Sequence, residues 1–277
     1  MVDKKITPIK FILGIFVIFW SLVAALPFVF MVLNSFKDKF EILTEGVFAI
    51  PKKFEITNYV NVIKGNFIHF FINSVIVVVV ALSILLFISA CASYPLSRFK
   101  FNLAKPLYGV IVACMSIPIH ITLIPVFKMS QALHVYDSIV ALIGPYVATA
   151  IPISVFILTS FMREIPKEIE ESAEIDGCNK FQMFFKIIFP LAKPGLATLA
   201  IYNGVNMWNE FSFAYTLTQS AKNKTLPLAV WEFQGQYSMN TPMIMTVLTL
   251  TVIPMILLFA FMQERLVKGM TAGAVKG

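Results

Sequence analysis

The chain has 277 residues, of which 58% are hydrophobic and only 13% are charged, and its mean hydropathy is +0.82. A soluble domain usually carries about 25% charged residues, so this composition excludes an ordinary soluble enzyme or binding domain. The net charge of +7 does not indicate a nucleic-acid-binding protein, because the basic residues lie between apolar segments rather than in one stripe.

Six apolar segments are each long enough to cross a bilayer as an α-helix, which takes about 20 residues. None of them shows the short alternating pattern of a transmembrane β-barrel. We therefore predict an all-α, polytopic membrane protein, with one transmembrane domain over residues 1–277 and six transmembrane helices. The predicted spans are residues 11–33, 68–93, 107–127, 138–161, 194–217 and 242–262.

The first apolar segment follows Lys4, Lys5 and Lys10, as the apolar core of a secretory signal peptide would. It is longer than the roughly 7–15 apolar residues of such a signal, and Ala24-Ala25-Leu26-Pro27 is a poor cleavage site. We expect an uncleaved first helix, with a removed signal peptide as the alternative.

The distribution of lysine and arginine predicts the orientation of the chain, because cytoplasmic loops carry an excess of these residues. Residues 94–106 give the clearest signal, since they include Arg98, Lys100 and Lys105 and no acidic residue. We expect a multi-pass protein of the plasma membrane with both termini in the cytoplasm.

Several of the predicted spans contain prolines, including Pro118 and Pro125 in the third and Pro145 and Pro152 in the fourth. A proline removes one helical hydrogen bond and kinks the helix, and neighbouring helices can compensate for the loss. The prolines fit either kinked packing or the flexible lining of a transport pathway, and the sequence leaves both interpretations open.

The segment between the fourth and fifth spans, residues 163–193, is charged and has helical periodicity. Pro166 suits a first helical turn, and the glutamates that follow it complement the positive end of the helix dipole. Gly177 fits the left-handed position that ends a helix, and a second apolar stripe runs from Phe181 to Phe189. We predict two helices joined by a glycine turn, which insert into a cleft of a soluble partner. An amphipathic hairpin on the lipid surface is the alternative, and the acidic first helix disfavours it.

Within this loop, Glu171-Ser172-Ala173 is followed after three residues by Gly177, and after nine more by Ile187-Ile188-Phe189-Pro190. The pattern resembles the EAA motif of ABC-importer permeases, with serine in place of the first alanine and phenylalanine in place of a leucine. In that family the motif forms the cytoplasmic coupling helix and docks onto the nucleotide-binding subunit. The resemblance implies the ATPase-coupling residues Glu171, Ser172, Ala173, Asp176, Gly177, Ile187 and Pro190.

Further stretches extend the resemblance along nearly the whole chain. They are Asn73-Ser74, residues 93–98, Pro190 to Gly195, Trp208-Asn209-Glu210-Phe211 and Leu226-Pro227-Leu228. Together they are similar to the carbohydrate-uptake branch of the family, and most of all to the second permease of maltose-type systems.

That resemblance implies a sugar or oligosaccharide substrate, an extracellular solute-binding protein, two nucleotide-binding ATPase subunits and a second, different permease subunit. The sequence contains no GxxxxGK[ST] phosphate-binding loop, so ATP and magnesium are expected on the ATPase subunits. We expect no cofactor and no enzymatic activity in this chain, and we expect contact with lipid but not with nucleic acid.

The fifth predicted span carries an unusual set of polar residues. Asn203, Asn206 and Glu210 are spaced by three and four positions, with Trp208 and Asn209 beside them. An ionised carboxylate in hydrocarbon costs about 2.5–3.5 kcal/mol on insertion scales unless water or a partner solvates it. These residues are candidates for the substrate pathway, because amides, a carboxylate and an aromatic ring suit a sugar. The alternative is helix packing or contact with the binding protein.

Three classes of function compete. An ABC-importer permease for a sugar explains the charged loop, and a permease for glycerol phosphate or another polar solute would explain it equally. An ion-coupled secondary transporter usually has paired ionisable residues near the bilayer midplane, and here only Glu210 is available. A membrane-embedded enzyme is disfavoured, because no HExxH or GxSxG motif and no paired acids occur inside the spans.

Overall fold

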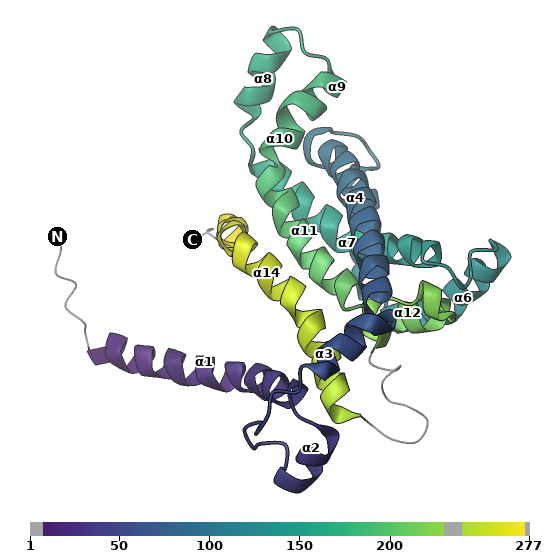
Figure 1. The fold of residues 1–277 in the computed structure, drawn as a ribbon. Coiled ribbons are helices and arrows are strands. Elements are labelled where there is room, and N and C mark those ends of the chain that lie inside the picture. The colour runs from purple at the N-terminus through teal and green to yellow at the C-terminus, as the bar shows by residue number, and fades with distance from the viewer. Residues whose placement is uncertain (1–7, 230–239, 275–277) are drawn as a thin grey trace. The chain divides into compact units, whose positions relative to one another are not determined.

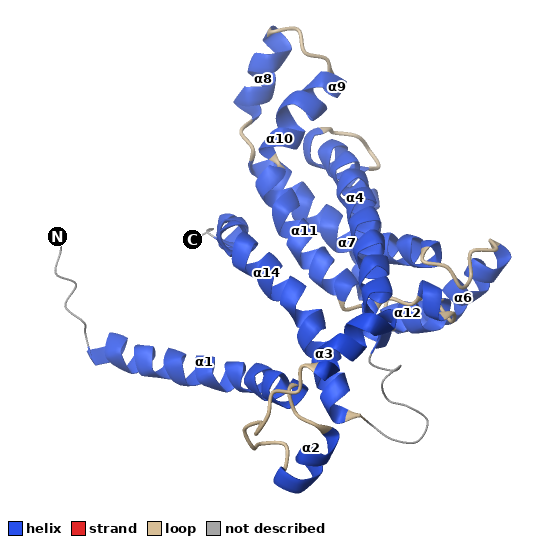
Figure 2. Cartoon of the chain, in the orientation of Figure 1, coloured by secondary structure: helices blue, strands red, loops and turns tan. Residues whose placement is uncertain are grey.

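The computed structural model describes residues 8–229 and 240–274, and the side chains of these residues up to 261. Over this part of the chain the secondary structure consists of helices without any strand (Figure 1, Figure 2). The chain divides into two compact units, Met1–Ile68 with Ala229–Pro254, and His69–Leu228 with Met255–Gly277. Each unit is described by itself.

Within the described part of the chain, four helices are each long and apolar enough to cross a membrane. They cover Pro8–Ser35, Thr57–Arg98, Val140–Glu164 and Thr241–Phe261. Two bent pairs of helices pass the same test, Ala104–Ser116 with Ile119–Ala132 and Lys180–Leu191 with Lys193–Trp208, so the number reaches six if each pair is one span. The predicted all-α, polytopic fold is confirmed.

The first unit contains the N-terminal span and the loop that follows it. Its helices are α1 (Pro8–Ser35), α2 (Lys39–Glu45), α3 (Thr57–Val62) and the first part of α14 (Thr241–Ala274). Lys37 is fully buried, and its ammonium group donates to Asn34 Oδ1 and to two main-chain carbonyl oxygens at 3.0–3.2 Å. The negative end of the α1 dipole favours a cation at this point.

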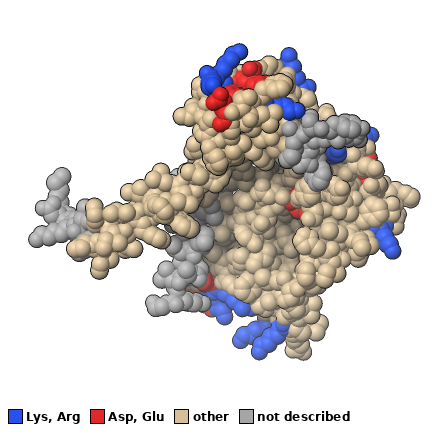
Figure 3. All heavy atoms as spheres, turned by 90° about the horizontal axis from the view of Figure 1, so that it is seen from below, with Lys and Arg blue, Asp and Glu red and all other residues tan. Residues whose placement is uncertain are grey.

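The second unit holds the later part of α14 and, among the described residues, nine further α-helices. They are α4 (Ile68–Arg98), α5 (Ala104–Ala113), α6 (Leu123–Ala132), α7 (Val140–Glu164), α8 (Lys167–Ile175), α9 (Lys180–Met183), α10 (Phe189–Leu191), α11 (Lys193–Trp208) and α12 (Ser212–Leu217). A π-helical turn, Phe184–Ile188, joins α9 to α10. Most of the face drawn in Figure 3 carries neither acidic nor basic residues.

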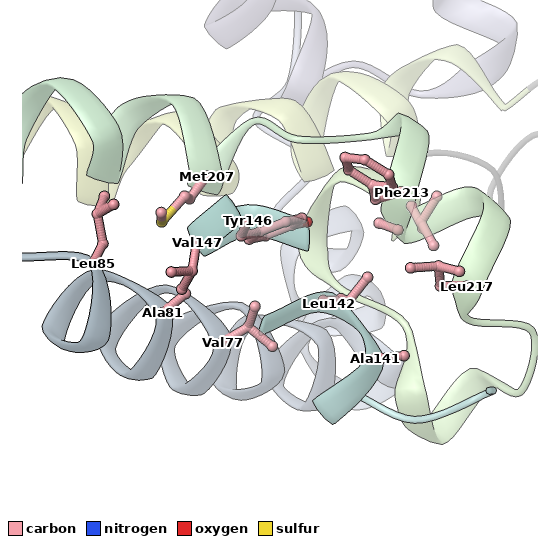
Figure 4. Packing of buried hydrophobic residues seen from close by; sticks show 12 residues of the cluster. Val77, Ala81, Leu85, Ala141, Leu142, Tyr146, Val147, Met207, Phe213 and Leu217 are labelled. Atoms are coloured by element: carbon pink, nitrogen blue, oxygen red, sulfur yellow. The ribbon is translucent and has the colours of Figure 1, made fainter. Parts of the chain in front are cut away.

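Two apolar clusters hold the second unit together. The first joins α4, α7, α11 and α12, and the buried Tyr146 lies within it (Figure 4). The second joins the other end of α4, α7 and α11 to the hairpin of α8 and α9, through residues such as Met162, Ala173 and Ile188. Gly195 allows a close approach of α11 to α7, because a Cβ atom there would lie 2.9 Å from the Phe161 ring.

The third and fifth predicted spans are not single straight helices. After α5 the chain becomes extended at Ile117 and Pro118, and the two halves are bent by 92°. A proline disfavours the helical conformation of the residue before it, which explains this break. Pro145 and Pro152, in contrast, lie inside the uninterrupted α7. In the fifth predicted span, α11 ends at Trp208 and α12 begins four residues later.

Candidate functional site

A cavity of about 750 Å³ lies in the second unit, where α7 and α11 meet the two helix breaks. Its walls mix aromatic rings with hydrogen-bonding groups, a combination that suits a polar organic solute. The lining includes Tyr146, Tyr202, Phe211, Asn206, Asn209 and Glu210.

Glu210 lies in the break between α11 and α12, and its carboxylate is hydrogen-bonded within the chain. It accepts from the main-chain N–H of Phe213 at 2.9 Å and of Ala214 at 3.2 Å, and from the Tyr146 hydroxyl at 3.0 Å. The two amides belong to the first turn of α12, where a helix favours negative charge. Glu210 therefore stabilises the restart of the helix and connects it to α7.

Asn206 and Asn209 are exposed on the cavity wall. The Nδ2 group of each donates at 2.9 Å to a carbonyl oxygen of its own helix, Tyr202 O and Val205 O respectively. Each side chain keeps its amide oxygen as an acceptor for a ligand hydroxyl. Of the five predicted pathway residues, these two are the exposed ones, and contact with a substrate stays a prediction.

Asn203 and Trp208 pack inside the protein instead. Asn203 is 2% exposed and donates to Ser154 Oγ at 3.0 Å, so it links α11 to α7 although it also borders the cavity. Trp208 is buried, and its ring meets Phe71 of α4 edge-on, at 5.7 Å between centroids. Both residues therefore take part in helix packing, which was the alternative to a role in the substrate pathway.

The loop after α12 is hydrogen-bonded to α4 on one side and to Asp137, just before α7, on the other. Asn73 Nδ2 donates to the carbonyl oxygens of Lys222 and Lys224, both at 2.9 Å, and Leu226 N donates to Ser74 Oγ at 2.8 Å. The Asn73-Ser74 and Leu226-Pro227-Leu228 stretches, about 150 residues apart, therefore contact each other. Sequence reasoning singled out both stretches but did not predict their contact.

On its other side, this loop is held by Asp137. Its carboxylate accepts from the main-chain N–H of Gln219 at 2.8 Å and of Ser220 at 2.9 Å, and from the Ser220 hydroxyl. Asp137 itself has a positive φ of 54°, an uncommon conformation that aspartate tolerates better than most residues. No signal in the sequence pointed to this residue, because all its partners on the loop lie more than 80 positions away.

The hydrogen bonds of Asp137 to the loop predict that the folded state becomes less stable in acid. Partial burial raises the pKa of the Asp137 carboxyl, but hydrogen bonds from Ser220, Gln219 and Asn223 outweigh it and hold the pKa at about 2, below the ordinary 3.8. The folded state thus binds the proton less readily than the unfolded state, so this stabilisation is complete above about pH 4 and is lost as the pH falls towards 2. We expect Asp137→Asn to remove that acid dependence between pH 4 and pH 3 in thermal unfolding, and to speed tryptic cleavage after Lys222 at neutral pH. Identical acid dependence in both proteins would contradict the assignment.

The hairpin of α8 and α9 has the predicted form of helix, glycine turn and helix, and it projects beyond the end of α4 (Figure 1). Gly177 has φ +82°, the left-handed conformation expected of it. Asn179 and Gln182 form a capping box that starts the second arm.

The predicted coupling residues divide into two groups in the hairpin. Glu171, Ser172, Asp176 and Gly177 are exposed at its outer end. Ala173 is buried in the apolar cluster, and Ile187 and Pro190 are half-buried in the second arm. The first group is the more accessible to another protein, and docking stays a prediction.

Comparisons with known proteins agree with this architecture. Residues 85–272 match the family described as "Binding-protein-dependent transport system inner membrane component". The ABC transporter permease protein ORF2 of Caldicellulosiruptor sp. strain Rt8B.4 is 48% identical over 95% of this chain and 96% of its own length. The diacetylchitobiose uptake system permease protein NgcG of Streptomyces coelicolor is 31% identical, over 94% of this chain and 86% of its own.

A solved structure has the same fold. It is the crystal structure of a bacterial ABC transporter involved in the import of the acidic polysaccharide alginate, and one of its chains matches with a TM-score of 0.81. The match covers 95% of this chain and 98% of that one, at 18% sequence identity.

Proposed function

Because this chain belongs to the family of binding-protein-dependent transport system inner membrane components, we propose that it forms part of the pathway by which a sugar or oligosaccharide enters the cell. The observation that carries the proposal is the 750 Å³ cavity beside the helix breaks. The amide oxygens of Asn206 and Asn209 would accept from sugar hydroxyls, while the rings of Tyr202 and Phe211 offer apolar faces to a pyranose.

The carbohydrate class is supported by the relative named for diacetylchitobiose uptake, which aligns along most of both chains. The chemistry of the cavity agrees, since no lysine or arginine is found among the described residues that line it. A phosphorylated solute such as glycerol phosphate would call for such a cation. An uncharged sugar therefore suits the cavity better.

The chain is a transport subunit, and its energy would come from separate subunits. Two nucleotide-binding ATPase subunits would hold ATP and magnesium, and a second permease subunit would complete the pathway. The exposed residues at the outer end of the hairpin, Glu171, Ser172, Asp176 and Gly177, would dock onto an ATPase subunit in the cytoplasm. Both termini would then lie on the same cytoplasmic side, although residues 1–7 and 275–277 lie outside the described part of the chain.

In this arrangement the loop fastened by Asn73 and Asp137 lies on the opposite side of the membrane, where an extracellular solute-binding protein would deliver the sugar. ATP-driven closure of the ATPase subunits would move the hairpin and open the cavity alternately to the two sides. Residues 230–239, which follow this loop, lie outside the described residues.

The experiment that tests this function is the ATPase activity of the complete transporter in lipid, measured with its solute-binding protein and a panel of sugars and glycerol phosphate. We expect stimulation by a sugar only when the binding protein is present. Uptake by this chain alone, driven by an ion gradient, would overturn the proposal in favour of a secondary transporter.

A further inference from the structure

The hairpin and α4 are joined by an ion pair at the base of the hairpin. Arg98, in the last turn of α4, places Nε 2.5 Å from Glu170 Oε1 of α8. The same guanidinium group donates through Nη2 to the carbonyl oxygen of Ile165 at 2.8 Å, in the segment that leads into α8. One side chain therefore holds both the helix and its entry segment, through two different nitrogen atoms of the planar guanidinium group.

This ion pair is shielded from water. The Arg98 side chain is 4% exposed and that of Glu170 is 13% exposed. By contrast, the ion pair between Lys180 and Glu174 in the same hairpin has side chains that are 60% and 48% exposed. An exposed pair contributes little, whereas removing one partner of a buried pair leaves the other charge uncompensated.

The end of α4 is attached to its surroundings by further contacts. The Tyr94 ring, one turn before Arg98, lies 5.2 Å from that of Phe184 in the second arm of the hairpin. Arg163 at the end of α7 donates to Leu96 O at 3.3 Å. Both arms of the hairpin and the end of α7 thus contact the last two turns of α4.

We propose that the Arg98–Glu170 ion pair transmits the movement of the hairpin to α4, so that both residues are positioning residues for the coupling of ATP hydrolysis to transport. Apolar packing between the hairpin and α4 can slide, but a buried ion pair together with the hydrogen bond from Arg98 Nη2 to Ile165 O fixes direction and register. α4 runs from the hairpin to Asn73 and Ser74, which hold the loop after α12. A displacement of α8 would therefore reach the opposite end of the second unit along one continuous helix. The inference rests on the proposed function.

The test compares Glu170→Gln, Arg98→Glu and the exchange Arg98→Glu with Glu170→Arg in the complete transporter reconstituted in vesicles. Two rates are measured for each variant, ATP hydrolysis stimulated by the binding protein and uptake of the stimulating sugar. For Glu170→Gln and Arg98→Glu we expect at least a tenfold fall in sugar transported per ATP hydrolysed, with hydrolysis retained. We expect the exchange to recover at least a third of the wild-type ratio.

The matched control is Glu174→Gln, which breaks the exposed ion pair of the same hairpin and should change the ratio by less than twofold. A merely structural role would lower uptake and hydrolysis in parallel with the amount of assembled complex, and that outcome would overturn the inference. An unchanged ratio in Glu170→Gln would overturn it as well, with the proposed function intact. A wild-type transporter without ATP-driven uptake would overturn the proposed function and this inference together.

Discussion

Replacing Ala173 by glutamate is expected to lower ATP-driven uptake by more than tenfold and to reduce the amount of ATPase subunit that co-purifies. Ala173 is 7% exposed and packs in the cluster that contains Met183 and Phe184 of the second arm. A carboxylate there would lose its hydration without gaining a partner, at a cost of several kcal/mol. The two arms would separate, and the docking surface would lose its shape.

Lys167→Glu is the matched control for this substitution. It places the same side chain on the same helix at an exposed position, in the first turn, where negative charge is favourable. We expect uptake and co-purification within twofold of the wild type. Normal assembly and uptake in Ala173→Glu would contradict the view that the arms of the hairpin move as one packed unit.

The hairpin was predictable because its signals are local. Pro166 immediately precedes α8, one position before the first turn predicted for it, Gly177 adopts the left-handed conformation that its position indicated, and the second apolar stripe forms the arm that follows. Sequence periodicity did not predict which of two neighbouring residues is buried and which is exposed. Ser172 and Ala173 are neighbours in the motif that resembles the EAA motif, but Ser172 is exposed and Ala173 is buried against the second arm.

Hydropathy predicted the apolar segments but not their shape. Hydropathy averages over a window, so it does not register the break at Pro118 or the interruption before α12. The polar residues of the fifth span were recognised, but the sequence did not distinguish those exposed to the cavity from those that contact neighbouring helices. Asn203 lies inside the helix packing, and Glu210 turns back onto the next helix.

The contacts that organise the second unit were beyond the reach of sequence reasoning. Asp137, Asn73 and Arg98 each meet partners at least 65 positions away, and one sequence carries no signal for such pairs. Arg98 was interpreted as a topology signal only. Its buried ion pair with Glu170 shows that a positively charged residue beside a span can serve packing as well as orientation.

Glu210→Ala is expected to destabilise the transporter and to abolish most of its uptake. The substitution removes the acceptor for two main-chain amides of α12 and for the Tyr146 hydroxyl. A buried donor left without a partner costs about 1–3 kcal/mol, so two or three of them would detach α12 from α7. Thermal unfolding of the purified complex measures the loss of stability, and sugar uptake measures its consequence.

Glu210→Gln and Asn209→Ala separate this structural role from sugar binding. Glutamine keeps one acceptor oxygen, so we expect an intermediate stability and at least half of the wild-type uptake at a saturating sugar concentration. Asn209→Ala removes a cavity acceptor that supports no other element, and one lost hydrogen bond should raise the half-saturating sugar concentration about three- to tenfold with stability unchanged. If Glu210→Gln instead kept full stability and raised the half-saturating concentration as much as Asn209→Ala, the carboxylate would be a sugar ligand, and its hydrogen bonds to α12 would be incidental.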